Sequence, residues 1–317
     1  MSTVLTITLN PTVDLFAETD VVRPVRKIRT SNDRCDPGGG GINVARVITE
    51  MGGDAEALFL CGGPTGTWLN ALLEKAGIRR HMLPISGDTR VAYAVHERGS
   101  GFDYRFVPAG PSVSAQEIEP CMEIIRSRNA RYVVASGSLP AAAPPDTYAR
   151  MARIVAEQGG RFVLDTSGDG LRVTLEQARV FLVKPSIGEL GQFVGHELDE
   201  QAAREAAMNL VRRGAAEMVA VTMGAQGALL ATAEGVMKMP APRVKARSAI
   251  GAGDSFLGAM VWALAKDWVV KGAFHLGIAA GAAAVLTPGT QLCRHEDIRS
   301  LYPMSPNANT EREGGID

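Results

Sequence analysis

The sequence predicts an α/β protein in which helices cover both faces of a mostly parallel sheet. Two observations support this class. Short β-rich runs alternate with helical patterns, with strands at 132–135, 162–164, 181–183 and 218–222 and helices near 115–128, 146–158, 173–178 and 200–213. Such alternation implies right-handed crossovers between parallel strands. The second observation is a pair of β runs around residues 97–101 that breaks the rhythm, and we expect it to form a lid over a site.

The N-terminal part contributes further elements. Thr alternates with aliphatic residues over 4–9, which indicates a strand that ends at Asn10-Pro11. The stretch that follows, up to Asp36, is polar, and we expect irregular structure there. The remaining patterns predict helices at 42–51 and 67–76, a strand at 55–60, and a hairpin of two strands at 90–96 and 102–107.

Composition limits the class of protein. The chain has 317 residues, of which 46% are apolar and 21% charged, with a net charge of −1. These values are typical of a globular protein with a large core. An almost neutral chain has no general attraction for nucleic acid or acidic membranes, so we expect neither as a partner. The four cysteines form no C-x-x-C pair, which favours reduced thiols and a cytoplasmic location.

The C-terminal part contains no predicted membrane span. The apolar run at 276–286 is rich in Ala and Gly and is far shorter than the ~20 residues that a span needs. We interpret it as a tightly packed helix. From about residue 303 the chain is polar and aperiodic, so we expect one domain over 1–302 and a disordered tail at 303–317.

The run Gly251-Ala252-Gly253-Asp254 precedes an apolar helical pattern. A helix that begins near Asp254 presents unpaired N–H groups and a positive dipole end, and glycines let a phosphoryl group approach them. A carboxylate repels an anion there, so its presence favours a general base that takes a proton from an attacking hydroxyl. The alternative is that Asp254 is a simple N-cap.

Four consecutive glycines, from Gly38 to Gly41, precede Asn43. Glycines lose much conformational entropy in an ordered loop, which indicates that backbone must approach a ligand closely. Asn43 would donate and accept hydrogen bonds at the first turn of the next helix. A dinucleotide-binding turn is the rival interpretation, and we rank it lower because Arg34-Cys-Asp-Pro37 does not read as a strand.

Polar residues follow several predicted strands, where open parallel sheets bind ligands. Lys184 and Glu189 are candidates for nucleotide phosphates and for Mg²⁺ held through water, or for a structural ion pair with each other. Thr222 and Gly224 offer a hydroxyl and a backbone N–H to a phosphate. Asp14, after the first strand, is either a sugar ligand or a solvated turn residue.

Four cations lie on the polar stretch and the hairpin: Lys27, Arg29, Arg90 and Arg105. Arginine forks match phosphate oxygens, although solvated surface is the favoured interpretation for each of these residues taken singly.

Four motifs occur together in one order: Pro37-Gly-Gly-Gly-Gly-Ile-Asn-Val-Ala-Arg46, Ser136-Gly-Ser-Leu-Pro140, Lys184-Pro-Ser-x-x-Glu189 and Gly251-Ala-Gly-Asp254. From about residue 4 to 302 the chain resembles the PfkB (ribokinase-like) carbohydrate kinases. Two further runs resemble the 6-phosphofructokinase branch of this family more than ribokinases or adenosine kinases. They are Tyr104-Arg-Phe-Val-Pro108 and Gly289-Thr-Gln-Leu-Cys293. The resemblance implies a three-layer αβα sandwich with a β-sheet lid contributed by about 12–36 and 88–108.

The resemblance also implies an activity. ATP would transfer its γ-phosphoryl group to the 1-hydroxyl of fructose 6-phosphate, with Asp254 as base and the amides of Gly251, Ala252 and Gly253 as anion hole. Tagatose 6-phosphate or fructose 1-phosphate is an alternative acceptor, and a non-catalytic sugar-phosphate sensor is a different class. By match to family positions, the residues that would contact the sugar are Asp14, Gly39, Gly40 and Asn43. Those that would contact the 6-phosphate are Lys27, Arg90, Arg105 and Ser138.

The nucleotide positions by the same resemblance are Lys184, Ser186, Thr222, Gly224 and Gly227, with Glu189 for Mg²⁺. Ser186 stands where the family usually has Asn, which shortens the reach of this side chain. A K⁺ site near Ser248, Ile250 and residues 285–291 is common in the family, and Gln291 replaces a usual Arg. The lid resembles the one through which many relatives form homodimers.

Overall fold

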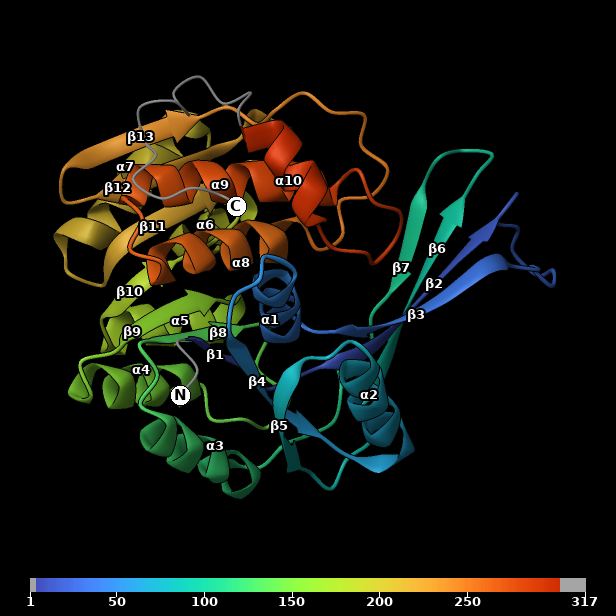
Figure 1. Cartoon of the computed structure of the whole chain (residues 1–317), viewed down its shortest axis with the longest axis horizontal. Helices are drawn as coiled ribbons and strands as arrows, with labels where there is room; N and C mark the ends of the chain where they lie inside the picture. Colours follow the sequence, from blue (N-terminus) through green and yellow to red (C-terminus); the bar gives the residue numbers. More distant parts are fainter. Residues whose placement is uncertain (1–3, 303–317) are drawn as a thin grey trace.

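The computed structural model describes residues 4–302, so the predicted tail at 303–317 lies outside the described residues. A nine-stranded sheet lies between two layers of helices, and a smaller sheet projects from one side (Figure 1). The strand order of the large sheet is β13-β12-β11-β10-β9-β8-β1-β4-β5, and all pairs are parallel except β11 with β12 and β12 with β13. The predicted fold class is confirmed.

The strands of the large sheet are β1 (Val4–Thr8), β4 (Ala55–Cys61), β5 (Arg79–Pro84), β8 (Tyr132–Ser136), β9 (Arg161–Asp165), β10 (Val180–Val183), β11 (Ala216–Thr222), β12 (Ala228–Thr232) and β13 (Gly235–Met239). The helices are α1 (Gly40–Glu50), α2 (Gly63–Lys75), α3 (Ala115–Arg128), α4 (Thr147–Glu157), α5 (Gly168–Gln177), α6 (Ile187–Val194), α7 (Glu200–Arg212), α8 (Ala252–Ala265), α9 (Val270–Ala284) and α10 (His295–Leu301). A 3₁₀ turn, η1, spans Gly224–Gln226.

The core is divided by the large sheet into two apolar clusters, one on each face. Strands such as β1 and β4 are buried along their whole length, which explains their nearly continuous apolar sequence. Helices α8 and α9 are almost entirely buried and pack through Phe256 and Phe274, whose rings meet edge to face. Each such buried side chain contributes about 1.5–3 kcal/mol, so this pair of helices is a firm support for the residues at its ends.

The lid is a four-stranded sheet in the order β3-β2-β6-β7. Its strands are β2 (Thr12–Thr19), β3 (Ser31–Gly38), β6 (Arg90–Glu97) and β7 (Asp103–Phe106). The expectation of irregular structure up to Asp36 was therefore wrong for β2 and β3, and it holds only for residues 20–30 between them. The first residues of β3 are exposed edge-strand residues with no apolar alternation, so backbone pairing with β2, rather than a buried face, defines this strand.

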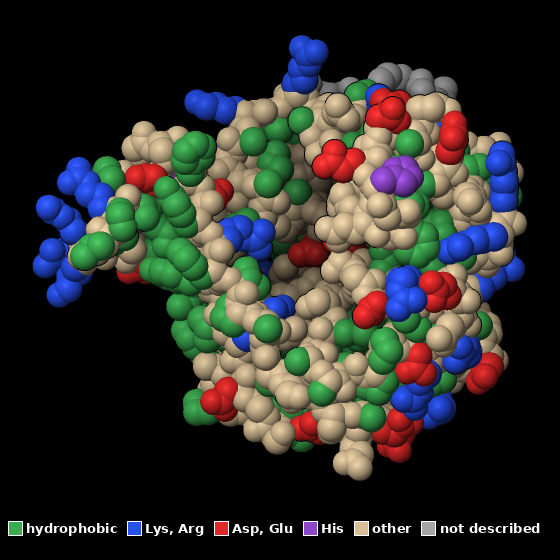
Figure 2. Space-filling model, turned by 180° about the vertical axis from the view of Figure 1, so that it is seen from behind, with side chains coloured by type: hydrophobic (Ala, Val, Ile, Leu, Met, Phe, Trp, Pro, Cys, Tyr) green, Lys and Arg blue, Asp and Glu red, His purple; other side chains and the backbone are tan. Residues whose placement is uncertain are grey.

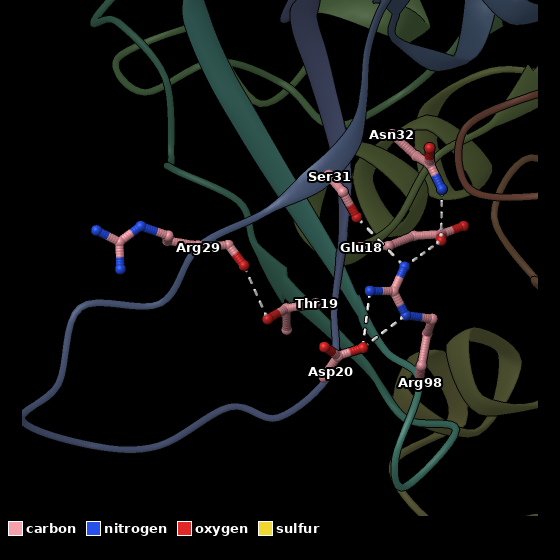
Figure 3. A network of polar contacts seen from close by, with 7 residues as sticks. All are labelled: Glu18, Thr19, Asp20, Arg29, Ser31, Asn32 and Arg98. Atoms are coloured by element: carbon pink, nitrogen blue, oxygen red, sulfur yellow. Dashed lines mark hydrogen bonds and ion pairs between the residues drawn. The ribbon is translucent and has the colours of Figure 1, made fainter.

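The far end of the lid is held together by charged side chains (Figure 3). Arg98, in the turn between β6 and β7, forms ion pairs with Glu18 at 3.1 Å and Asp20 at 2.8 Å. Thr19 Oγ1 donates to the carbonyl of Arg29 at 3.1 Å. These contacts fix both ends of the segment between β2 and β3, which carries Lys27.

Several helices and strands were not predicted from the sequence patterns, or were predicted with different bounds. The strands β5, β12 and β13 and the helices α6 and α10 were not predicted, and α5 begins five residues before the expected 173. Helix α6 is only eight residues long, which is too short for a clear helical period. Within residues 4–302, no helix combines the length and apolar character that crossing a bilayer requires.

Candidate active site

A polar cavity of about 280 Å³ lies at the carboxyl edge of the large sheet, beneath the lid. The space-filling view shows this hollow between the lid and the body, with acidic side chains deep inside and cations on its lid side (Figure 2). Its lining includes ten of the predicted site residues: Asp14, Gly39, Gly40, Asn43, Arg90, Arg105, Ser138, Glu189, Gly251 and Asp254.

The first turn of α8 forms the floor of the cavity. Gly251 is the N-cap, with a left-handed φ of 73°, and a Cβ there would lie 2.6 Å from Leu292 Cδ2. No side chain caps this helix, and Asp254 lies in its first turn without an N-cap role. The alternative that Asp254 is merely an N-cap is therefore wrong. The Ala252 N–H makes a long hydrogen bond of 3.4 Å to the carbonyl of Ala249, and the other N–H groups of this turn remain available for an anion.

The Asp254 carboxylate is held in a defined position. Asn43 Nδ2 donates to Asp254 Oδ2 at 2.8 Å. Burial, together with the nearby Asp165 carboxylate, raises the pKa of Asp254 to about 6, although Asn43, Lys184 and Arg46 act in the opposite direction. A carboxyl group with this pKa is ionised at neutral pH and accepts a proton more readily than an ordinary aspartate, as a general base requires.

Lys184 pairs with Asp165 rather than with Glu189. The Lys184 Nζ to Asp165 Oδ1 distance is 3.1 Å, and both side chains are largely buried. Burial opposes the ammonium charge, but Asp165, Glu189 and Asp254 together raise the pKa of Lys184. Its Nζ lies 3.4 Å from the position of a Cβ on Gly253, so a permanent positive charge adjoins the first turn of α8.

The glycine run brings backbone close to its neighbours, as predicted. A Cβ on Gly40 would overlap Ser136 Oγ, and one on Gly41 would overlap the carbonyl of Ile7. Gly39 has a φ of 113°, which side chains rarely adopt. The argument against a dinucleotide turn was wrong in one respect, because β3 does run directly into the glycines. That strand belongs to the lid, however, and not to the parallel sheet that such a turn requires.

The sugar and phosphate candidates occupy the lid side of the cavity. Burial raises the pKa of Asp14 to about 6, although Thr12, Arg105 and Arg46 act against this. Arg90 donates to the carbonyls of Pro108 at 2.9 Å and Asn10 at 2.8 Å. These two bonds fix the orientation of the guanidinium.

Lys27 is the one predicted substrate residue that this chain does not bring to the cavity. It is exposed on the segment between β2 and β3, at the far end of the lid. Figure 2 shows cations clustered at that end, away from the hollow.

A second pocket, of about 520 Å³ and mostly apolar, adjoins the first turn of α8 from the other side. Thr222, Gly224 and Gly227 lie in its wall, as do Ala252 and Gly253. Gly227 has a φ of 93°, and a Cβ there would overlap the carbonyl of Met239. The first turn of α8 thus separates a polar cavity, lined by Gly251 and Asp254, from an apolar pocket of a size suited to a nucleotide.

Ser186 and Glu189 form a capping box at the start of α6. Ser186 Oγ accepts from the Glu189 N–H at 3.2 Å, and Glu189 Oε2 accepts from the Ser186 N–H at 2.7 Å. Glu189 nevertheless lines the polar cavity. Among residues 4–302, no group of three or more His, Cys, Asp or Glu side chains is placed to hold a metal.

The segments named for a monovalent cation lie side by side. Ser248 Oγ donates to the carbonyl of Gly289 at 3.0 Å, and the Arg247 N–H donates to the carbonyl of Val285 at 2.7 Å. Gln291 Oε1 is buried without a hydrogen-bond partner in the part of the chain that the structure describes.

Three charged residues of the site were given no role from the sequence: Asp36, Arg46 and Asp165. Asp165 ends β9, and its place at the end of a predicted strand is the signal that indicates it. Asp36 and Arg46 gave no comparable signal, because they meet only once β3 and α1 are folded against each other.

Comparison with known proteins agrees with this geometry. Residues 7–297 match the pfkB family carbohydrate kinases. The chain belongs to that family, as the sequence motifs predicted.

Among its relatives, the ATP-dependent 6-phosphofructokinase isozyme 2 of Mycobacterium tuberculosis is 42% identical over 95% of this chain and 89% of that protein. A structure of phosphofructokinase-2 from Escherichia coli in complex with potassium is 36% identical, with a TM-score of 0.91, over 96% of this chain and 99% of that one. The same enzyme solved in complex with fructose-6-phosphate is 35% identical, with a TM-score of 0.89, over 96% and 99% of the two chains.

Proposed function

We propose that this chain is an ATP-dependent sugar-phosphate kinase that converts fructose 6-phosphate to fructose 1,6-bisphosphate. One observation carries the proposal: Gly251 and Asp254 line a polar cavity with two arginines, while Ala252 and Gly253 line an apolar pocket on the other side of the same helical turn. A phosphoryl group bound at this turn is within reach of an acceptor in the cavity and of a nucleotide in the pocket.

In the proposed reaction, the 1-hydroxyl oxygen of the sugar attacks the γ-phosphorus and transfers its proton to Asp254. The new P–O bond forms as the bond to the β,γ-bridging oxygen breaks, and the electron pair leaves on ADP. Backbone N–H groups of Gly251, Ala252 and Gly253 donate hydrogen bonds to the transferred group and stabilise the negative charge that develops on it. Each donor of this kind lowers the barrier by about 3–4 kcal/mol. Lys184 supplies a fixed positive charge beside them.

The sugar is oriented by Asp14, Asn43 and the backbone of Gly39 and Gly40, all of which line the cavity. Arg90, Arg105 and Ser138 would hold the 6-phosphate. Arg105 is exposed, so it is accessible to an entering phosphosugar.

Mg²⁺ fits this site as a companion of the nucleotide. Glu189 is a single carboxylate at the cavity wall, and Mg²⁺ is usually bound by one or two carboxylates plus water and substrate phosphates. When bound, Mg²⁺ would neutralise charge on the phosphates. Ser186 is engaged in the capping box, so we expect it to position Glu189 rather than to contact the ion.

We also propose a K⁺ site between Ser248 and the 285–291 loop. The unpartnered Gln291 Oε1 supports it, because a buried neutral acceptor suits a cation better than the arginine usual in the family. Measuring activity in potassium and in tetramethylammonium salts at equal ionic strength tests the idea. Equal rates in both would contradict it.

A cytoplasmic homodimer is the expected form. The lid exposes Val21, Val25, Ile28, Phe102, Phe106 and Val107, a set of apolar side chains that suits pairing with a second lid. Such pairing would also bring Lys27 to the cavity of the partner. Light scattering of the purified protein distinguishes dimer from monomer.

The central experiment compares kcat/KM, with Mg-ATP, for fructose 6-phosphate, tagatose 6-phosphate, fructose 1-phosphate and fructose. Phosphorus NMR of the product identifies the hydroxyl that is phosphorylated. The proposal predicts fructose 6-phosphate as the best acceptor and a product phosphorylated at the 1-position. A preference for fructose itself would refute the role of Arg90 and Arg105, and binding without turnover would favour the sensor.

A further inference from the structure

Arg46 lies behind the cavity lining, at the centre of a chain of polar contacts that ends at Asp254. It occupies the same helix as Asn43, three residues further on, and its side chain is 18% exposed. Arg46 Nη1 donates to Asn43 Oδ1 at 3.1 Å, and Asn43 Nδ2 in turn donates to Asp254 Oδ2 at 2.8 Å. The hydrogen bonds of Arg46 therefore extend to the proposed base through Asn43.

The orientation of the Asn43 amide decides what Asp254 meets. If the amide were turned over, its oxygen would face the carboxylate and repel it, and its NH₂ group would face the guanidinium. A guanidinium has only donors, so Arg46 can be satisfied by Asn43 in one orientation alone. That orientation directs the amide donors at Asp254.

The guanidinium is itself fixed by the end of β3. Arg46 Nη1 also donates to the carbonyl of Pro37 at 2.9 Å, and Arg46 Nη2 lies 3.6 Å from Asp36 Oδ1. Asp36 Oδ2 accepts a hydrogen bond from Thr290 Oγ1 at 2.6 Å. Arg46 thus joins β3, α1 and the 285–291 loop in one fixed arrangement.

We propose that Arg46 is a positioning residue for phosphoryl transfer: it locks the Asn43 amide in the orientation that holds the Asp254 carboxylate for proton abstraction. The inference rests on the proposed kinase function. It adds a residue that touches neither substrate nor nucleotide and that a simple search of the cavity wall misses.

The charges around Arg46 give its proposed role a measurable effect on the pH dependence of the rate. Arg46 faces three carboxylates, namely Asp14 from β2, Asp36 from β3 and Asp254 from α8. On its other side, Asp254 faces Asp165 and Lys184. Arg46 favours the ionised forms of Asp14 and Asp254, so its loss moves the acid limb of the rate profile to higher pH.

The test compares Arg46→Met and Arg46→Lys with the wild type and with Arg128→Met. Arg128 is a matched control, since it forms a bidentate ion pair with the largely buried Glu56, outside the cavity lining. For each protein, kcat and KM are measured from pH 5 to 8.5, with active enzyme quantified by nucleotide binding and the thermal midpoint recorded.

We expect Arg46→Met to lower kcat by about tenfold or more, since small displacements of a catalytic group have effects of up to ~10². Its acid limb moves to higher pH. Arg46→Lys keeps the charge but lacks the fork that contacts Pro37 and Asn43 together, so its acid limb stays near that of wild type while kcat remains reduced. Arg128→Met lowers the thermal midpoint and leaves kcat and the acid limb unchanged.

Two results would overturn the inference. Either both Arg46 variants retain the wild-type kcat and acid limb, or they resemble Arg128→Met, with lower stability and an unchanged rate per active site. If Arg46→Met does not fold, Arg46→Lys alone decides, since a reduced kcat with an unmoved acid limb is expected of it. A wild-type protein that phosphorylates none of the sugars refutes the proposed function instead.

Discussion

Removing the Asp254 carboxyl group, or titrating it, tests the proposed chemistry most directly. The pKa of Asp254 is raised to about 6, and only the ionised form can accept a proton. Roughly nine tenths of the groups are ionised at pH 7 and roughly one tenth at pH 5, so the rate of phosphoryl transfer should fall about tenfold over this interval. Replacing Asp254 by Asn should reduce the rate by about 10²–10⁴ at pH 7 and abolish the acid limb.

The assay must report the chemical step, because product release limits kcat in many enzymes and would hide the titration. Single-turnover quench experiments with saturating sugar phosphate supply that rate. Asp14→Asn is the matched control. Asp14 also has a pKa raised to about 6, but in the proposed mechanism it binds sugar and abstracts no proton. The variant should weaken sugar binding and keep the acid limb of the chemical step.

Asp254→Asn also has a predicted effect on the stability of the fold. Because the folded-state pKa of Asp254 lies above its ordinary value of 3.8, its ionisation destabilises the fold as pH rises through 4 to 6. The stability lost by pH 7 approaches about 3 kcal/mol, from about 1.4 kcal/mol per unit of pKa. Asp254→Asn should therefore raise the thermal midpoint at pH 7 and change it less at pH 4.5. The reasoning fails if the variant keeps more than a tenth of the wild-type rate, or if the wild-type rate is flat from pH 5 to 7.

Three further substitutions probe separate parts of the site. Gly40→Ala places a Cβ against Ser136 Oγ and should lower stability by about 1–3 kcal/mol and reduce turnover. Gly188→Ala is its control: Gly188 lies in α6 with open space around it, so this change should not lower stability. Lys184→Met leaves a buried carboxylate unpaired and should destabilise the fold by about 3–5 kcal/mol while raising KM for ATP, which thermal melts and ATP titrations measure. Arg105→Met should raise KM for fructose 6-phosphate about tenfold to a hundredfold, since a charged hydrogen bond contributes about 1.5–3 kcal/mol, with little change in kcat.

The sequence predicted the body of the fold better than the lid. Strands of the large sheet are buried on both faces, so their apolar runs stand out between amphipathic helices. In the lid, β3 has the sequence Ser-Asn-Asp-Arg-Cys-Asp-Pro-Gly and an exposed first half. Its structure depends on pairing with β2, and a pairing partner leaves no trace in local periodicity.

Candidate site residues stand out in the sequence where local backbone geometry requires a particular amino acid. Gly251 and Gly39 have positive φ angles, and a side chain on Gly40 would collide with Ser136. Glycine at such positions is visible in the sequence as an unusual run. Asp254 could be identified by its place directly after one of these runs.

Partnerships between distant residues were not predictable in the same way. Lys184 and Glu189 are close in sequence and suggested an ion pair, yet Lys184 pairs with Asp165 across the sheet. Strand order decides this outcome, because β9 and β10 are neighbours whose carboxyl ends meet. Glu189 instead caps its own helix through Ser186.

Arg46 is an example of a residue whose contacts with distant parts of the sequence affect several groups of the site. The half-buried carboxylates Asp14 and Asp254 each have a pKa of about 6. This value is close enough to neutrality that a modest loss of positive charge would leave a large share of both groups protonated at pH 7. Arg46 is the cation that acts on both. Because Arg46 also contacts the Asn43 amide, the proposed mechanism makes this one side chain a link between sugar binding, orientation of the base and the charge state of both carboxylates. A change at this position should therefore alter kcat and KM together.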